Sequence, residues 1–135
     1  MTHNLTRRFL MLIGFGGLAS ASTVAEAKTR RFHSVTGLRK DKADFYIELH
    51  AEAWPGVLKR IKESNIRNYS IFRYGELLFA YMEYVGEDLE ADLARMAADP
   101  ITQAWWEVCG PLQSPVVDRD EGEWWKALPE VFHLD

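Results

Sequence analysis

A tyrosine and a histidine four residues apart, Tyr46 and His50, are the side chains best suited to proton transfer. On a helix this spacing places both on one face, one turn apart. Histidine has an ordinary pKa of about 6.5, so it can donate and accept a proton near neutral pH. Trp54 continues the same face, directly before Pro55, which disturbs helical hydrogen bonding. The stretch predicts an acid–base site among aromatic rings or, alternatively, a half-buried amphipathic stripe that packs on a sheet.

Other sites are less well supported by the sequence. His33 and His133 lie in strand-like patterns, where we expect satisfied or surface histidines. No His-Glu-x-x-His motif occurs, and His50-x-Glu52 lacks the Pro-Cys-x-x-Cys that accompanies it in zinc deaminases. The glycines at 14–17 belong to the N-terminal apolar run and form no phosphate loop. We therefore expect neither a metal nor a cofactor.

The elements that would position His50 begin with a strand predicted at 30–38, which ends near a glycine. Asp41 is the predicted N-cap of the helix that carries Tyr46 and His50. This helix is expected to be irregular at 54–56, to resume, and to close at Ser64-Asn65.

A hairpin is predicted next, from a strand at 66–74, a turn at 74–76 and a strand at 77–85. In the first strand, Tyr69 should point to the opposite face from Asn68. The second strand is apolar on both faces, so it should lie centrally in the sheet or against a partner chain.

Two further helices and a last strand complete the pattern. One helix is predicted at 87–98, and Asp99-Pro100 should start another that carries Trp105 and Trp106. Adjacent residues differ by about 100° around a helix, so the two indoles cannot both enter one core. A loop should cover 110–123, followed by a strand at 128–134.

The order is βαββαβ with the second helix interrupted. It predicts an α+β fold, a ferredoxin-like sandwich of an antiparallel sheet with helices on one face. The other face then needs a cover, and a second copy of the same sheet would supply it.

Residues 1–27 have the composition of an export signal rather than of a folded segment. Arg7 and Arg8 form a twin-arginine-like start, an apolar run follows, and Ala25-Glu26-Ala27 is a small-x-small cleavage candidate. We expect a periplasmic protein that begins near Lys28 and keeps no membrane span after cleavage; an uncleaved or lipid-anchored N-terminus is the alternative.

Residues 28–135 form one domain's worth of sequence. The first 27 residues contain two arginines and one glutamate, so the remainder has a formal net charge of −5, against −4 for the whole chain. No basic patch offsets this charge, which disfavours a nucleic-acid partner. The single cysteine, Cys109, cannot form an intrachain disulfide, so the fold must be stabilised by its core.

Several short motifs, in order along the chain, are shared with one family. They are Tyr46-x-x-x-His50 with Trp54-Pro55, Asn68-Tyr69, Leu77-Leu78-Phe79-Ala80, Trp105-Trp106 and Glu130-Val131-Phe132-His133-Leu134. In these residues the chain resembles the L-rhamnose mutarotases, sugar-anomer epimerases of the dimeric α/β-barrel superfamily. The resemblance implies a homodimer without cofactor, a monosaccharide substrate, His50 as the proton donor, and a sugar held by Tyr46, Tyr69, Trp105 and Trp106.

The sequence also departs from that family. Ala51-Glu52 replaces the Asn-Pro that often follows the histidine, and Gln113-Ser114-Pro115 occupies the place of an Asp/Asn-rich loop. An export signal is atypical of a cytoplasmic rhamnose pathway. Two alternatives therefore stay open: a non-catalytic sugar-binding module, and a monooxygenase of the same superfamily. Fold alone does not decide between them.

Overall fold

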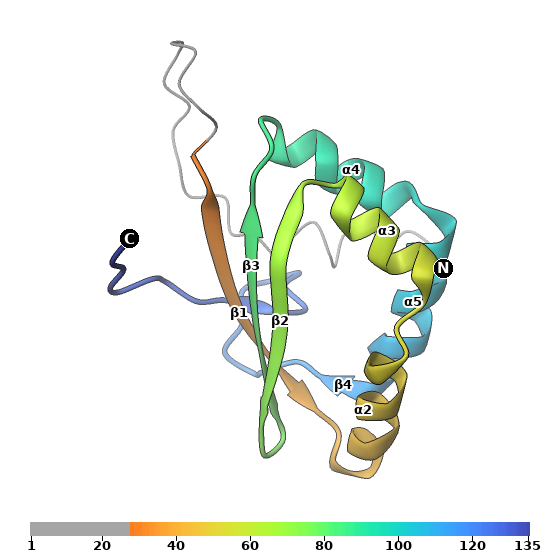
Figure 1. Cartoon of the computed structure of the whole chain (residues 1–135). Coiled ribbons are helices and arrows are strands. Elements are labelled where there is room, and N and C mark those ends of the chain that lie inside the picture. Colours follow the sequence, from red (N-terminus) through yellow and green to blue (C-terminus); the bar gives the residue numbers. More distant parts are fainter. Residues whose placement is uncertain (1–27) are drawn as a thin grey trace.

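An antiparallel sheet with helices on one face forms the described part of the chain, residues 28–135, in the computed structural model (Figure 1). The predicted export signal at 1–27 lies outside the described residues. The strands are β1 (Arg30–Leu38), β2 (Ile66–Tyr74), β3 (Leu77–Tyr84), β4 (Gln113–Ser114) and β5 (Lys126–Ala127). They are arranged in the order β2-β3-β1-β4, and β5 also pairs with β1. The predicted α+β ferredoxin-like arrangement is confirmed, with β3 in the interior of the sheet.

The first helical region is divided where the sequence predicted an irregularity. A short 3-10 turn, η1 (Lys40–Lys42), leads into α2 (Ala43–Ala51), and α3 (Pro55–Glu63) follows after a break. Pro55 is tolerated at the first position of α3 because no helical partner is needed there. The predicted N-cap was wrong: Lys42 occupies that position, and the Asp41 carboxylate accepts hydrogen bonds from Arg39 instead.

In the second helical region both N-caps are aspartates, of which the sequence predicted Asp99 but not Asp88. In α4 (Leu89–Ala98) the N-cap carboxylate of Asp88 accepts from the Ala91 N–H at 3.0 Å. In α5 (Pro100–Cys109) the carboxylate of Asp99 accepts from the Thr102 N–H at 2.8 Å. A 3-10 turn, η2 (Gly110–Leu112), then leads to β4.

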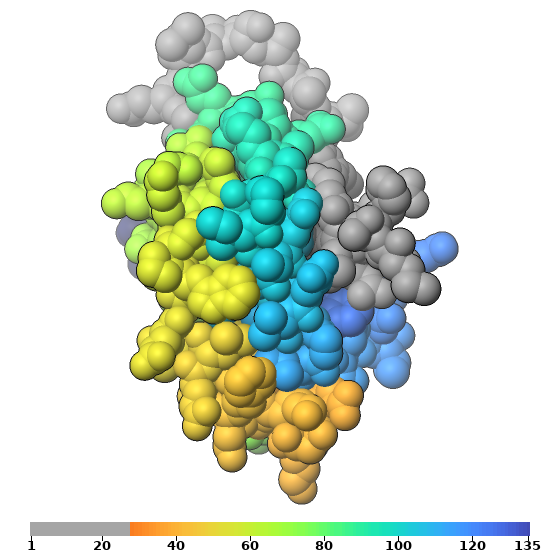
Figure 2. Space-filling view, turned by 90° about the vertical axis from the view of Figure 1, so that its right-hand side faces the viewer, coloured from red at the N-terminus to blue at the C-terminus, as the bar shows by residue number. Residues whose placement is uncertain are grey.

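Within residues 28–135 the helices cover one face of the sheet, and no helix of this part of the chain lies on the other face (Figure 1). Figure 2 shows the covered side, where α2 and α3 in orange to yellow lie beside α4 and α5 in cyan to blue. The core between the layers contains alternate residues of β3, each of which faces the helices: Leu78, Ala80, Met82 and Tyr84. Apolar burial of this kind is the main stabilising term of such a fold.

A buried carboxylate ties α4 to the sheet. Asp92 accepts hydrogen bonds from the Tyr84 hydroxyl at 2.5 Å and the Asn65 amide at 2.9 Å, and it also pairs with Arg95. Burial by itself would raise the pKa of Asp92, but these three donors hold it below its usual value. The carboxylate therefore stays ionised at neutral pH and links α4 to β3 and to the end of α3.

The predicted strand at 128–134 was wrong. The segment that pairs with β1 is β5, which precedes residue 128 in the chain. After β5, the Leu128 N–H donates to the His33 carbonyl at 2.9 Å, and residues 129–135 form no strand. Pro129 has no N–H to donate, so it interrupts a ladder at this point. The tail passes on the side of the sheet opposite the helices (Figure 1), with Glu130 accepting two hydrogen bonds from Arg31.

No helix in residues 28–135 is long and apolar enough to cross a membrane.

Candidate functional site

The Tyr46 phenol and the His50 imidazole stack on each other along the inner face of α2. Their ring centroids are 4.0 Å apart and their planes meet at 26°. Tyr46 is buried and His50 is half-buried, so the imidazole is reachable while the phenol backs it. The spacing prediction is confirmed, since one helical turn separates the two residues.

A backbone hydrogen bond determines which nitrogen of the His50 imidazole carries the hydrogen. His50 Nδ1 lies 2.9 Å from the Tyr46 carbonyl oxygen. A carbonyl can only accept, so Nδ1 must carry the hydrogen and donate. In the neutral ring Nε2 is then the unprotonated nitrogen, available to take a proton from a bound molecule.

Trp105 from α5 closes the other side of the imidazole. Its ring meets His50 edge-on, with centroids 5.1 Å apart, and meets Trp54 in the same manner at 5.3 Å. Trp54 lies in the break between α2 and α3, directly before Pro55, and the break places its indole at the site. Trp105 packs with Val57 and Cys109 in a small apolar cluster of its own.

Trp106 diverges from its neighbour, as the helical spacing required. Trp105 is buried, whereas Trp106 is half-buried and packs against both the main core and the smaller cluster around Trp105. The indole of Trp106 is therefore the more accessible of the pair.

Tyr69 reaches the site through a β-bulge in β2. The pairing of β2 with β3 shifts between Arg67 and Ser70, and Asn68 has a left-handed backbone with φ of 48°. Two residues of β2 thus oppose one residue of β3, and Tyr69 turns to the helix side, where it packs against the core. The Asn68 amide donates to Glu83 Oε2 at 2.7 Å and holds the bulge from the opposite face.

The environment shifts every titratable group of this cluster toward its neutral form. Burial lowers the pKa of His50, although the hydrogen bond to the Tyr46 carbonyl opposes it. Burial raises the pKa of Tyr46 far above its ordinary value and raises the pKa of Tyr69 to about 12. Burial likewise raises the pKa of the Cys109 thiol to about 12, so this cysteine is not a nucleophile at neutral pH. At pH 7 the site therefore contains a neutral imidazole among neutral phenols.

The structure brings the five predicted site residues together. His50, Tyr46 and Trp105 are in ring contact, Tyr69 lies close enough to Tyr46 to raise its pKa, and Trp106 packs against the same core. Their roles in binding and catalysis stay predictions.

Two residues near the site were not predicted. The side-chain oxygen of Gln113 accepts a hydrogen bond from Trp124 Nε1 at 2.6 Å, and the nearby Gln113 amide partly opposes the rise in the pKa of Tyr46 that burial causes. The late tryptophan pair at 124–125 was a signal in the sequence, but no local pattern showed where it would pack.

The other two histidines of the described chain lie apart from this cluster. His33 faces the side of the sheet opposite the helices, where its ring is 5.1 Å from Tyr81. His133 is in the tail and pairs with Asp135 at 2.9 Å. Both are outside the α2 site, as expected.

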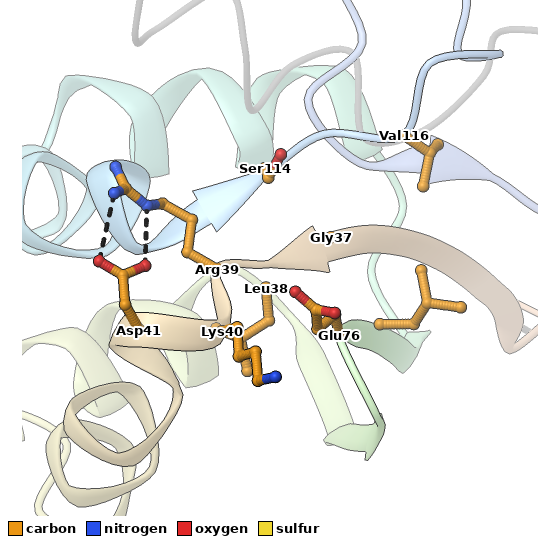
Figure 3. A pocket seen from close by; sticks show the side chains of 9 residues that line it. Gly37, Leu38, Arg39, Lys40, Asp41, Glu76, Ser114 and Val116 are labelled. Carbon is orange, nitrogen blue, oxygen red and sulfur yellow. Dashed lines mark hydrogen bonds and ion pairs between the residues drawn. The ribbon is translucent and has the colours of Figure 1, made fainter.

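A surface cavity of about 450 Å³ lies between the end of β1, the turn from β2 to β3, and β4 (Figure 3). None of the five predicted site residues lines it. Its charged side chains include Arg39 and Asp41, which point toward each other and pair at 3.3 Å (Figure 3). It offers no imidazole or aromatic ring, so we place the candidate site around Tyr46 and His50.

Comparison with known proteins gives a consistent result. Residues 31–134 match the family model of L-rhamnose mutarotase. The chain is 35% identical over 107 residues to an L-rhamnose mutarotase of Lactiplantibacillus plantarum, covering 78% of this chain and 98% of that protein. It is 34% identical over 97 residues to one from Oceanobacillus iheyensis, covering 70% and 88%. It also resembles the crystal structure of an L-rhamnose mutarotase from Formosa agariphila, with a TM-score of 0.60, 25% identity, and coverage of 78% and 99%.

Proposed function

The chain belongs to the L-rhamnose mutarotase family, and we propose that it interconverts the α and β anomers of free L-rhamnose. It is an isomerase with the dimeric α/β-barrel fold, as the sequence led us to expect. The observation that carries the proposed chemistry is the orientation of His50, whose Nδ1–H is held by the Tyr46 carbonyl while Nε2 is left free.

Anomer exchange needs one proton to move within the sugar. A base removes the proton of the anomeric hydroxyl, the bond between the anomeric carbon and the ring oxygen breaks, and the ring oxygen gains a proton. The resulting open-chain aldehyde rotates and recloses on its other face by the reverse steps. His50 Nε2 takes the proton from the first oxygen and, as the imidazolium, returns it to the second, so protons balance over one opening.

The aromatic residues would hold the sugar against this nitrogen. The C–H face of a pyranose suits a flat indole, and Trp106 is the accessible member of the Trp105-Trp106 pair. The Tyr46 and Tyr69 hydroxyls are neutral and therefore able to donate to sugar hydroxyls. A methyl-bearing deoxy-hexose suits the apolar surroundings of these rings.

Saturation-transfer NMR tests the proposal directly. The anomeric proton of one L-rhamnose anomer is saturated, and the loss of signal from the other anomer gives the exchange rate. We expect the rate to rise above the blank in proportion to protein concentration, and L-fucose measured in parallel shows how strictly the sugar is selected. Exchange at the blank rate with every sugar would sink the proposal. Shifts that report sugar binding without faster exchange would identify the binding-module alternative.

The protein is further proposed to be a homodimer. Apolar side chains on the tail and on β2 are exposed, namely Phe72, Tyr74, Val131, Phe132 and Leu134. Large apolar side chains exposed in this way favour an interface over a free surface. The sheet face that carries no helix supports the same arrangement, because a two-fold partner would cover it.

Export to the periplasm is likewise a proposal, supported by Arg7-Arg8, the following apolar run and Ala25-Glu26-Ala27. Mass spectrometry of the protein recovered from a periplasmic fraction should give a chain that starts at Lys28. Retention of the full-length chain in the cytoplasm would contradict it.

A further inference from the structure

Trp54 is the outer ring of a line of aromatic contacts that leads to the imidazole. Trp105 meets His50 edge-on with centroids 5.1 Å apart, and Trp54 meets Trp105 in the same manner at 5.3 Å. Trp105 is buried, whereas Trp54 is half-buried and covers it from the outside. Edge-to-face pairs of this kind stabilise more than their buried area alone, because the edge of one ring is attracted to the face of the other.

The backbone of Trp54 is held in one conformation from its C-terminal side. A residue before proline is restricted to extended backbone, and Trp54 has φ of −60° and ψ of 132° directly before Pro55. Its carbonyl accepts from the N–H groups of Val57 at 3.0 Å and Leu58 at 3.1 Å, which form the first turn of α3. The indole therefore projects from a fixed point at the start of this helix.

A glycine allows this start of α3 to come close to α5. A Cβ at position 56 would lie 2.8 Å from Cδ1 and 3.1 Å from Cγ2 of Ile101, so any residue other than Gly56 would push these atoms aside. The same two helices share the small cluster of Val57, Trp105 and Cys109, against which Trp54 packs. The contact between the two helices thus seats Trp54 on Trp105.

The other members of the cluster cannot replace the Trp54 indole. Val57 and Cys109 have small side chains, so loss of the indole would leave a gap beside Trp105 that they do not fill. A ring beside a gap loses packing contacts on that side and gains freedom to shift. Because Trp105 restricts the His50 ring, the imidazole would gain the same freedom.

We propose that Trp54 is a positioning residue for the base: it holds Trp105 against His50, and Trp105 keeps the imidazole in the orientation in which Nε2 accepts a proton. This role rests on the proposed mutarotase function, because the proton comes from the sugar. Trp54 acts through Trp105 and touches no reacting atom in this scheme.

The kinetic test compares two substitutions by saturation-transfer NMR over a range of L-rhamnose concentrations. Trp54→Leu removes the ring, and Trp54→Phe keeps a smaller one. We expect Trp54→Leu to lower kcat by about 2–10-fold, the effect of one aromatic pair, with KM nearly unchanged. Trp54→Phe should recover most of that loss. An unchanged kcat in Trp54→Leu would overturn the proposal, and so would a raised KM at constant kcat, which would show that Trp54 binds the sugar directly.

A matched control is available in β1. Phe32 is also half-buried, and it packs against the main core rather than the small cluster. Phe32→Leu should lower stability, measured by denaturant unfolding, and leave kcat at the wild-type value. A loss of kcat equal to that of Trp54→Leu would show a merely structural effect and overturn the proposal.

A pH titration of the His50 ring signals by NMR tests the contact without any activity. The titratable side chains packed into this region are Tyr46, Tyr69 and Cys109, and all three are neutral at pH 7 because burial raises their pKa. Burial is also the main cause that lowers the pKa of His50. Trp54→Leu admits water, so it should shift the ring signals and raise the pKa of His50 toward its ordinary value, whereas Phe32→Leu should change neither.

The two measurements separate the positioning role from the proposed function. If the wild-type protein fails to accelerate exchange but Trp54→Leu moves the His50 signals and pKa, the mutarotase function fails, and with it the catalytic use of a contact that does exist. If exchange is fast and Trp54→Leu leaves the His50 signals and pKa unchanged, the positioning role fails on its own.

Discussion

At the scale of single residues, the site depends on which nitrogen of His50 is protonated. The Tyr46 carbonyl holds the hydrogen on Nδ1, and the stacked phenol and the edge of Trp105 restrict the ring from two sides. An imidazole held in this way needs no reorientation before it accepts a proton, which is the condition for efficient general base catalysis. Neither Glu52 nor Cys109 is suited to act as the general base, because Glu52 is exposed and the Cys109 thiol is buried and neutral.

Replacing His50 separates catalysis from structure. His50→Asn and His50→Gln should slow anomer exchange by about 10²–10⁴-fold, the usual contribution of a positioned acid–base group. Stability should change by no more than about 1–2 kcal/mol, because His50 is only half-buried. Tyr46→Phe should be milder, because it keeps the ring. Saturation-transfer NMR and denaturant unfolding measure the two effects.

The control for this substitution is His133→Asn, which removes an imidazole in the exposed tail and should leave exchange unchanged. Full activity of a folded His50→Asn protein would move proton transfer to another group and leave the mechanism without its base.

Acidification provides a second residue-level prediction. Burial lowers the folded-state pKa of His50, so the neutral form persists somewhat below the ordinary value of about 6.5. Exchange above the blank should be constant near neutral pH and fall in acid, with a midpoint below about 6.5. As the pH falls, the unfolded chain protonates His50 at the ordinary pKa, before the folded chain does. The free energy of unfolding therefore decreases as the pH drops from about 6.5 toward the lower folded-state pKa of His50. A rise in blank-corrected exchange on acidification would show that the imidazolium is the required form.

The spacing of residues predicted the local part of this site and the family resemblance supplied Tyr69, Trp105 and Trp106, whereas the neighbouring Gln113 and Trp124 were not predicted. Tyr46 and His50 are one helical turn apart, so their contact follows from helix geometry alone. Gln113 comes near Tyr46, and Trp124 bonds Gln113, only after β4 and the following loop have docked on β1. No periodicity in the chain encodes that docking, because it depends on pairing between distant segments.

At the scale of elements, the bulge in β2 decides where Tyr69 points. Strict alternation from Ile66 would place Asn68, rather than Tyr69, on the helix side. The extra residue reverses that alternation, so Ile66 is buried on the same side as Tyr69. The sequence put Tyr69 and Asn68 on opposite faces correctly, but it contained no signal for the register shift except an asparagine, which tolerates a left-handed backbone.

Substitutions at Asn68 test this arrangement. Asn68→Gly keeps the left-handed conformation and loses only the bond to Glu83, whereas Asn68→Val also places a β-branched residue at a φ of 48°. The strain of such a conformation is about 1–3 kcal/mol or more, so the valine variant should be the less stable of the two. It should also lose more exchange activity, since relaxation of the bulge turns Tyr69 away. Equal behaviour of the two variants in unfolding and exchange assays would show that the bulge does not control the site.

At the scale of the whole molecule, the order of strands and helices followed from hydrophobic periodicity, whereas the last strand did not. Residues 128–134 alternate like a strand, yet Pro129 interrupts the ladder and β1 is already paired by β4 and β5. The tail is instead anchored by the two hydrogen bonds from Arg31 to Glu130. Its apolar side chains stay exposed, with Val131 at 94% and Phe132 at 80%.

The exposed tail leads to the prediction about assembly. If a second copy covers it, the chain from 28 to 135 should sediment as a dimer at micromolar concentration. Phe132→Asp places a charge in that contact and should shift the equilibrium toward monomer, because a desolvated charge without a partner is costly. Phe45→Asp is the matched control: Phe45 is also exposed, at 51%, but lies on α2 on the helix side. It should leave the dimer intact. A wild-type chain that sediments as a monomer, or a Phe132→Asp variant that dimerises as well as wild type, would exclude the tail from the interface.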